Sequence, residues 1–220
     1  MNRITIFAGH YGSGKTNSAV AYAKYLKKES EKITIVDIDL VNPYYRTKDA
    51  ENELSEMGIK VLSPVYANTN VETPTIPAEV MSAFHQKDQK FIFDVGGDDD
   101  GAKVLGRFFS EFSQENCDFW LVINTKRPLT FDAKSIIIYM KEIESASRLK
   151  FNGLVNATNL SNETTINDIL ESEKIIAEVE ELTGIPKKHN FVLSSLIDGL
   201  PDELKKTSIS VDLINIKYWE

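Results

Sequence analysis

The stretch that decides the fold is "RITIFAGHYGSGKT", residues 3–16, close to the start of the chain. It passes from a short apolar run, Ile4–Ala8, into a loop that contains three glycines and ends in lysine and threonine. The loop fits the pattern G-x4-G-K-[ST] at Gly9, Gly14, Lys15 and Thr16. A strand that leads through such a loop into a helix is the setting in which this pattern binds phosphate.

The residue types of the loop suit that chemistry. Glycine tolerates positive φ angles, so successive backbone N–H groups can close around a phosphate. The N-terminus of the following helix adds about half a positive charge. We expect Lys15 to reach the β- and γ-phosphates and Thr16 to ligate magnesium. The predicted nucleotide-binding residues of the loop are Gly9, His10, Tyr11, Gly12, Ser13, Gly14, Lys15, Thr16 and Asn17. The alternative is a glycine-rich turn that only caps a helix.

Carboxylates end two further apolar runs. "ITIVDIDL", residues 33–40, carries Asp37 and Asp39, and "KFIFDVGG", residues 90–97, carries Asp94 and then Gly97. Side chains at the carboxyl ends of strands line the crevice in which α/β sheets bind ligands. Asp94 has the form of a Walker B aspartate, which holds magnesium through water, and the N–H of Gly97 can sense a γ-phosphate. The alternative for each aspartate is a turn or a helix cap.

Short apolar runs alternate with segments of helical period along the whole chain. The expected strands are Ile4–Ala8, Ile33–Val36, Ile59–Leu62, Phe91–Val95, Phe119–Ile123, Leu154–Val155 with its flanks, and Phe191–Leu193. The expected helices are Thr16–Lys28, Ala78–Gln86, Lys103–Phe112, Phe131–Arg148 and Thr165–Leu182. This alternation predicts a three-layer α/β/α fold with a mostly parallel central sheet of about seven strands, in a single nucleotide-binding domain over residues 1–220.

Composition narrows the function classes. A chain of 220 residues with a net charge of −8 is a poor default binder of nucleic acid, because phosphate contacts need clustered lysine and arginine. No apolar run is long enough to span a membrane, and the chain enters its first strand too early for a signal peptide, so we expect a cytoplasmic protein. Cys117 is the only cysteine, which excludes an intrachain disulfide and predicts a buried neutral thiol.

The sequence resembles the MinD/ParA/Mrp group of P-loop ATPases, from Gly9 to about Asn156. The loop, the D-x-D of Asp37 and Asp39, the D-x-x-G that starts at Asp94, and the "FNGLVNATN" stretch carry the resemblance. It implies ATP and magnesium as ligands. It further implies that Asp37 helps to hold magnesium, that Asp39 orients the attacking water beside the catalytic Lys15, and that Asn156 contacts adenine. No N-K-x-D motif for guanine is present, which also favours adenine.

His10 departs from this group. The group carries an extra lysine there, which in relatives crosses a dimer interface and neutralises charge on the partner's nucleotide. A histidine is mostly uncharged at pH 7 unless an anion binds it. Either hydrolysis is slow, or a partner or another residue such as Lys126 or Arg127 supplies the charge. The simpler interpretation is a loop side chain hydrogen-bonded to the backbone.

These observations predict a slow, magnesium-dependent ATPase that acts as a nucleotide-controlled switch on an unknown client protein, with a homodimer expected. Two alternatives stay open: an ATP-dependent phosphotransferase or ligase similar to dethiobiotin synthetase, and a nucleotide-binding subunit that does not hydrolyse. A membrane partner is disfavoured, because the final stretch "SISVDLINIKYWE" resembles a strand rather than a basic amphipathic helix. The Ser63–Pro77 loop and Asp98–Asp100 receive no assigned role.

Overall fold

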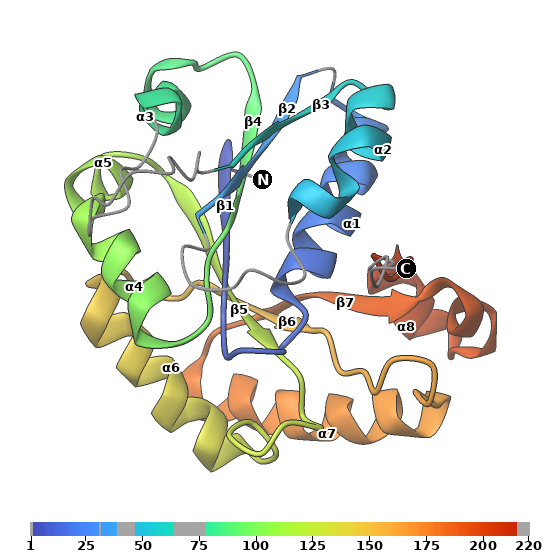
Figure 1. Cartoon of the computed structure of the whole chain (residues 1–220). Coiled ribbons are helices and arrows are strands. Elements are labelled where there is room, and N and C mark those ends of the chain that lie inside the picture. Colours follow the sequence, from blue (N-terminus) through green and yellow to red (C-terminus); the bar gives the residue numbers. More distant parts are fainter. Residues whose placement is uncertain (1, 31, 39–46, 64–77, 215–220) are drawn as a thin grey trace, which may run out of the picture.

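The structure is a computed structural model that describes residues 2–30, 32–38, 47–63 and 78–214. Its centre is a single sheet of eight strands in the order β3-β2-β4-β1-β5-β6-β7-β8 (Figure 1). The strands are β1 Ile4–Ala8, β2 Ile33–Asp37, β3 Ile59–Leu62, β4 Lys90–Asp94, β5 Cys117–Ile123, β6 Gly153–Asn156, β7 Lys187–Leu193 and β8 Ser208–Val211. Every neighbouring pair is parallel, which confirms the predicted fold class.

The prediction of about seven strands did not include β8. It lies at the edge of the sheet beside β7, with Asn190 opposite Ser208. Its four residues alternate in burial, so one face of this strand meets the protein and the other meets solvent. The strand-like appearance of the C-terminal stretch is therefore confirmed for Ser208–Val211, and the sheet has eight strands rather than about seven.

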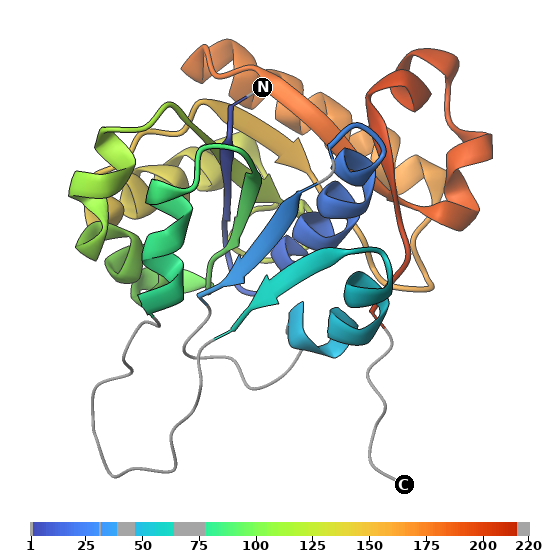
Figure 2. The same ribbon diagram turned by 90° about the horizontal axis from the view of Figure 1, so that it is seen from above.

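Helices cover both faces of the sheet (Figures 1 and 2). They are α1 Lys15–Lys27, α2 Glu51–Glu56, α3 Ala78–His85, α4 Asp98–Arg107, α5 Phe109–Ser113, α6 Ala133–Ser147, α7 Ile166–Thr183 and α8 Asp202–Thr207, with 3-10 turns at Thr47–Ala50 and Ser194–Gly199. Side chains alternate across β1: Ile4, Ile6 and Ala8 pack with α3 to α7, whereas Phe7 packs with α1 and α2. The continuous apolar run of β1 therefore serves two separate cores.

One predicted helix differs clearly from the observed structure, whereas the other four end within two residues of their predicted bounds. The expected helix Lys103–Phe112 begins five residues earlier, at Asp98, and divides into α4 and α5 at Phe108. The backbone of Phe108 leaves the helical region there, and its ring packs against Phe84 and Phe112. The six-residue helices α2 and α8 were not expected, because a helix of this length is too short to show a 3.6-residue period.

Caps fix the long helices in place. Thr165 caps α7 through a reciprocal pair of bonds with Asp168, and Gly184 ends α7 with a φ of 70°, both as the sequence indicates. Asp132 and Ser135 form the same kind of capping box at the start of α6. That helix ends at Arg148, a non-glycine residue with a φ of 63°.

The structure also bears on the predictions for Cys117 and for membrane-spanning helices. Cys117 is half-buried rather than fully buried, and burial raises the pKa of its thiol to about 12, so the thiol is neutral at pH 7. No helix in the described ranges is long and apolar enough to cross a membrane.

The two left-handed helix ends form a matched pair for a stability test. We expect Gly184→Ala to lower the free energy of unfolding by about 1 kcal/mol, because an L side chain is strained at this φ. Apart from the two adjacent residues, no atom in the described part of the chain lies within 4 Å of the added Cβ, so backbone strain is the main cost. Arg148→Gly should raise the free energy of unfolding, by less than Gly184→Ala lowers it. Glycine relieves the strain at this φ but also adds entropy to the unfolded chain. Urea unfolding measures both, and an unchanged Gly184→Ala midpoint would contradict the strain argument.

Candidate functional site

The predicted phosphate loop connects the end of β1 to the start of α1. Gly12 and Gly14 have φ angles of 73° and 92°, which is the left-handed region that favours glycine. The N–H of Ser13 donates to the carbonyl of His10 at 3.0 Å and closes the turn. A Cβ on Gly9 would lie 2.5 Å from the carbonyl oxygen of Val122, so the loop passes directly over β5. Glycine is therefore required at both ends of the loop for physical reasons.

Lys15 opens α1 and folds back over the loop. It is 7% exposed, and its Nζ donates to the carbonyl of His10 at 3.0 Å. This places the ammonium group against the loop backbone, where a bound phosphate would meet it. Thr16 and Asn17 lie in the same helical turn, and the Oδ1 of Asn17 accepts a hydrogen bond from the N–H of Ile214 at 3.1 Å.

Two of the predicted carboxylates lie side by side at the same edge of the sheet. Asp37 ends β2 directly opposite Asp94, which ends β4, and the exposed fractions of the two residues are only 2% and 1%. Asp94 also lies opposite Phe7 in β1, two residues before the loop begins. Thr47 donates from its Oγ1 to Oδ2 of Asp94 at 3.0 Å. Asp39, the predicted water-orienting residue, lies outside the described residues.

The donor set at this edge suits magnesium. Carboxylate and hydroxyl oxygens are the ligands that magnesium prefers, and this ion is usually held by one or two carboxylates plus substrate phosphates. Asp37, Asp94 and Thr16 are oxygen donors on three neighbouring elements that border the loop. In the described ranges, no group of three or more His, Cys, Asp or Glu side chains could hold a metal by itself.

The segment after β4 contacts the loop through Gly97. A Cβ on Gly97 would come within 2.8 Å of the backbone N and 2.9 Å of the Cα of Tyr11. Gly97 is extended, and α4 begins at the next residue, Asp98. The D-x-x-G segment and the phosphate loop are therefore in backbone contact, a link that the sequence pattern implied only through its family.

His10 is turned towards α6. Its Nδ1 lies 2.7 Å from the carbonyl oxygen of Tyr11, and its ring meets Tyr139 edge-on at a centroid distance of 5.3 Å. The simpler interpretation of His10, a loop side chain hydrogen-bonded to the backbone, agrees with this geometry.

The structure separates the two neighbouring cations that follow β5. The ammonium of Lys126 pairs with Asp168 at 2.7 Å and Glu171 at 3.2 Å, both on α7. Arg127 instead donates from its Nε to the carbonyl of Gly12 at 3.0 Å. Its guanidinium lies 3.4 to 3.7 Å from the position of a Cβ on Gly12. Of the two residues, Arg127 therefore lies on the phosphate loop.

Asn156, the predicted adenine contact, is buried and bonded within the protein. Its Nδ2 donates to Oγ of Ser172 and Oε1 of Glu173, both at 2.8 Å, and its Oδ1 accepts from the N–H of Thr158 at 3.0 Å. These bonds brace the end of β6 against α7. A contact between the Asn156 side chain and a base would compete with them, and that contact stays a prediction.

Asn159 is the polar side chain that the sequence reading missed here. Its Nδ2 lies 3.5 Å from the position of a Cβ on Gly14, and it belongs to a narrow cleft beside the loop. The cleft is lined by Gly14, Asn17, Ser18, Ala157, Asn159, Phe191, Leu193, Val211 and Leu213. The "NATN" stretch was the available signal, since its last residue stands where N-K-x-D has its aspartate.

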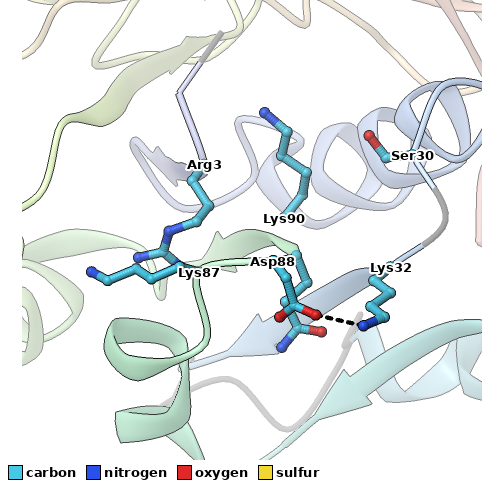
Figure 3. Close-up of a pocket in the computed structure, with 7 residues that line it drawn as sticks. Arg3, Ser30, Lys32, Lys87, Asp88 and Lys90 are labelled. Carbon is cyan, nitrogen blue, oxygen red and sulfur yellow. Dashed lines mark hydrogen bonds and ion pairs between the residues drawn. The ribbon is translucent and has the colours of Figure 1, made fainter.

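A larger hollow of about 660 Å³ lies at the other end of the strands, where β1, β2 and β4 begin (Figure 3). Arg3, Lys32, Lys87 and Lys90 contribute positive charge to it. Lys32 pairs with Asp88, Lys87 and Arg3 pair with Glu115, and Lys90 donates to the carbonyl of Asn2. These cations already have protein partners, so size alone does not make this hollow the candidate site, and the loop has the stronger chemical case.

Comparison with known proteins supports the fold. No family model matches the chain, and no curated protein matches it. Among solved structures, it resembles FtsY of Thermotoga maritima (18% identity, TM-score 0.60, 87% of this chain and 62% of that one). It also resembles FtsY of Mycoplasma mycoides (15%, TM-score 0.60, 97% and 65%) and the signal recognition particle 54 kDa protein of Aeropyrum pernix in complex with GDP (16%, TM-score 0.56, 86% and 41%).

These likenesses establish a P-loop NTPase fold. The chain spans about three fifths of the two FtsY proteins and about two fifths of the 54 kDa protein. Because the three relatives are of the signal recognition particle type, they do not show membership of the MinD/ParA group that the sequence resembles.

Asp168 provides a pH test of the ion pair that holds Lys126 away from the loop. The hydrogen bond from Lys126, with those from Thr165, lowers the pKa of Asp168 to about 2. A carboxyl whose pKa is lower in the folded state stabilises the protein above its unfolded pKa of about 4 and loses that effect as the pH falls towards 2. We expect the stability advantage of the wild type over Asp168→Asn to shrink between pH 5 and pH 1 (about one unit beyond each pKa). Urea unfolding at several pH values measures it, and a constant advantage would contradict the assignment.

Proposed function

We propose that this chain is a magnesium-dependent ATPase that acts as a nucleotide-controlled switch on a partner protein. The observation that carries the proposal is the contact between Gly97 and the backbone of Tyr11. It joins the phosphate loop to the start of α4, so a ligand in the loop can alter the position of a helix.

The described residues divide the chemical work. Backbone N–H groups of the loop and the ammonium of Lys15 bind the phosphates and neutralise charge that develops during transfer. Thr16, Asp37 and Asp94 would hold magnesium, which supplies further positive charge to the β- and γ-phosphates. Asp39 follows β2 by two residues in the sequence and is proposed to orient the attacking water.

A partner surface adjoins this site. Five large apolar side chains among the described residues are more than half exposed, and three of them lie on the loop or the segment next to it: Tyr11 in the loop, and Leu129 and Phe131 after β5. Arg127 ties the segment that carries the last two to the loop itself. An exposed tyrosine beside an arginine is typical of interface anchors. We infer that a second copy or a client binds here and that the bound nucleotide controls its affinity.

The proposed base is adenine. Guanine presents N–H donors that a carboxylate accepts, and the described residues that line the cleft beside Gly14 include no carboxylate. Asn159 uses part of its amide within the protein, since its Nδ2 donates to the carbonyl of Ala157 at 2.9 Å and its Oδ1 accepts from the N–H of Ser161 at 3.3 Å. Its second amide hydrogen and second lone pair can still pair with an acceptor and a donor on the edge of adenine. Since the 54 kDa protein was solved with GDP, the experiment needs both nucleotides.

Nucleotide binding and turnover by the purified protein test the proposal. With magnesium, we expect ATP to bind more tightly than GTP and to turn over slowly. Lys15→Ala should reduce turnover by about 100-fold or more, because it removes a charge that stabilises the transition state. Lys24→Ala is the matched control, because Lys24 lies on the same helix and pairs with Glu53 on the surface. Failure of the wild type to bind either nucleotide would overturn the proposal.

Gly97→Ala tests the switch separately from the chemistry. The added methyl group would collide with the Tyr11 backbone, so the loop and the start of α4 must move apart. We expect ADP affinity to change less than threefold, while any ATP-dependent change in mass, measured by light scattering, is lost. Gly184→Ala controls for a general loss of stability. A Gly97→Ala protein that still responds to ATP like the wild type would exclude this contact as the coupling element.

A further inference from the structure

Position 10 of the phosphate loop holds a histidine, where the group that the sequence resembles has a lysine. The His10 side chain lies against the carbonyl of Tyr11 and the ring of Tyr139. Transfer of a phosphoryl group builds negative charge, and an added cation close to that charge is worth about 10³- to 10⁵-fold in rate in comparable enzymes. Another side chain that contributes this charge would have to lie near the loop.

Arg127 is a cationic side chain that lies next to the loop. It follows β5, and its Nε donates to the carbonyl of Gly12 at the apex of the loop, 3.0 Å away. Its guanidinium carbon and one terminal nitrogen lie 3.5 and 3.7 Å from the position of a Cβ on Gly12. A Cβ at these distances would be in ordinary van der Waals contact with the planar group, so the φ of 73°, rather than lack of space, favours glycine at position 12. The turn Asn124–Thr130 fixes the segment, since the N–H groups of Arg127 and Thr130 bond to the carbonyls of Asn124 and Arg127.

The remaining donors of Arg127 are available to a ligand. A guanidinium carries five N–H donors in a planar fork that matches phosphate oxygens, and the Gly12 carbonyl uses only one of them. The terminal nitrogens make no hydrogen bond to the part of the chain that the structure describes. By contrast, two carboxylates hold the neighbouring Lys126, and they raise the pKa of its ammonium.

We propose that Arg127 supplies, from within the same chain, a positive charge to the phosphates of the nucleotide. The inference rests on the proposed ATPase function. In hydrolysis, the water oxygen bonds to the γ-phosphorus while the bond from phosphorus to the β,γ-bridging oxygen breaks. The products are ADP and inorganic phosphate, and the proton of the water passes to solvent. Arg127 neutralises charge on the phosphate oxygens during this step, and the loop carbonyl holds its fork in place.

The cis arrangement has a measurable consequence. If a second copy of the chain supplied the cation, turnover per chain would rise with protein concentration, because the active form would have to assemble. If the cation belongs to the same chain, turnover per chain does not depend on protein concentration. With Arg127 as the source of the charge, ATP hydrolysis does not require a dimer.

The experiment compares Arg127→Ala, Arg127→Lys and Lys126→Ala with the wild type. It measures turnover at saturating ATP over a hundredfold range of protein concentration, together with the dissociation constants for ATP and ADP. We expect Arg127→Ala to reduce turnover by about 10³-fold, Arg127→Lys to recover part of it, and Lys126→Ala to stay within about twofold of the wild type. ADP affinity of Arg127→Ala should change less than threefold, while its preference for ATP over ADP falls.

Three results would overturn the inference: normal turnover in Arg127→Ala, equal losses of ATP and ADP affinity, which would indicate that Arg127 only holds the loop, or wild-type turnover that rises with protein concentration. Failure of the underlying function gives a different result, because the wild type would then bind no nucleotide. If the wild type binds ATP without hydrolysis, the ATP preference of the variants decides the matter.

Discussion

The register of three parallel strands is the constraint on which the candidate site depends. β2, β4 and β1 are neighbours, with Asp37 opposite Asp94 and Asp94 opposite Phe7. This register brings two buried carboxylates to the edge of the sheet at which β1 turns into the phosphate loop. Burial on both faces fixes the register, because a shift by one residue would move Ile4, Ile6 and Ala8 into the core that belongs to Phe7. The core packing therefore positions the chemistry.

The position of the loop also depends on two glycines whose backbone packs too closely on other residues for a side chain to fit. A Cβ on Gly9 would meet the carbonyl of Val122, and a Cβ on Gly97 would meet the backbone of Tyr11. Backbone therefore packs directly on backbone at both ends of the site. Packed interfaces of this kind have few intermediate arrangements, so we expect a shift of the loop to move α4 in a discrete step rather than as a gradual deformation.

The sequence predicts the parts of this arrangement that local patterns encode. Strands such as β1 and β3 have the expected bounds, and the capped ends of α7 follow from Thr165 and Gly184. The predicted loop lies between β1 and α1, with Asp37 and Asp94 beside it. Sequence spacing gives no information on side-chain direction, so it could not show that internal bonds hold Asn156 or that Asn159 lies nearer to Gly14. The short helices α2 and α8 escape detection because six residues show no clear period.

The adjacent cations Lys126 and Arg127 show how tertiary structure resolves an ambiguity of sequence. Both follow the same strand and carry the same charge, so either could serve the loop. The start of α7 presents Asp168 and Glu171, and a flexible ammonium on a long stem can satisfy both carboxylates. A planar guanidinium instead fits against a glycine and donates to its carbonyl while further donors remain. The carboxylates of α7 thus fix one cation at a distance from the loop. In a chain of net charge −8, this local division, rather than the overall charge, determines which positive group can meet an anionic ligand.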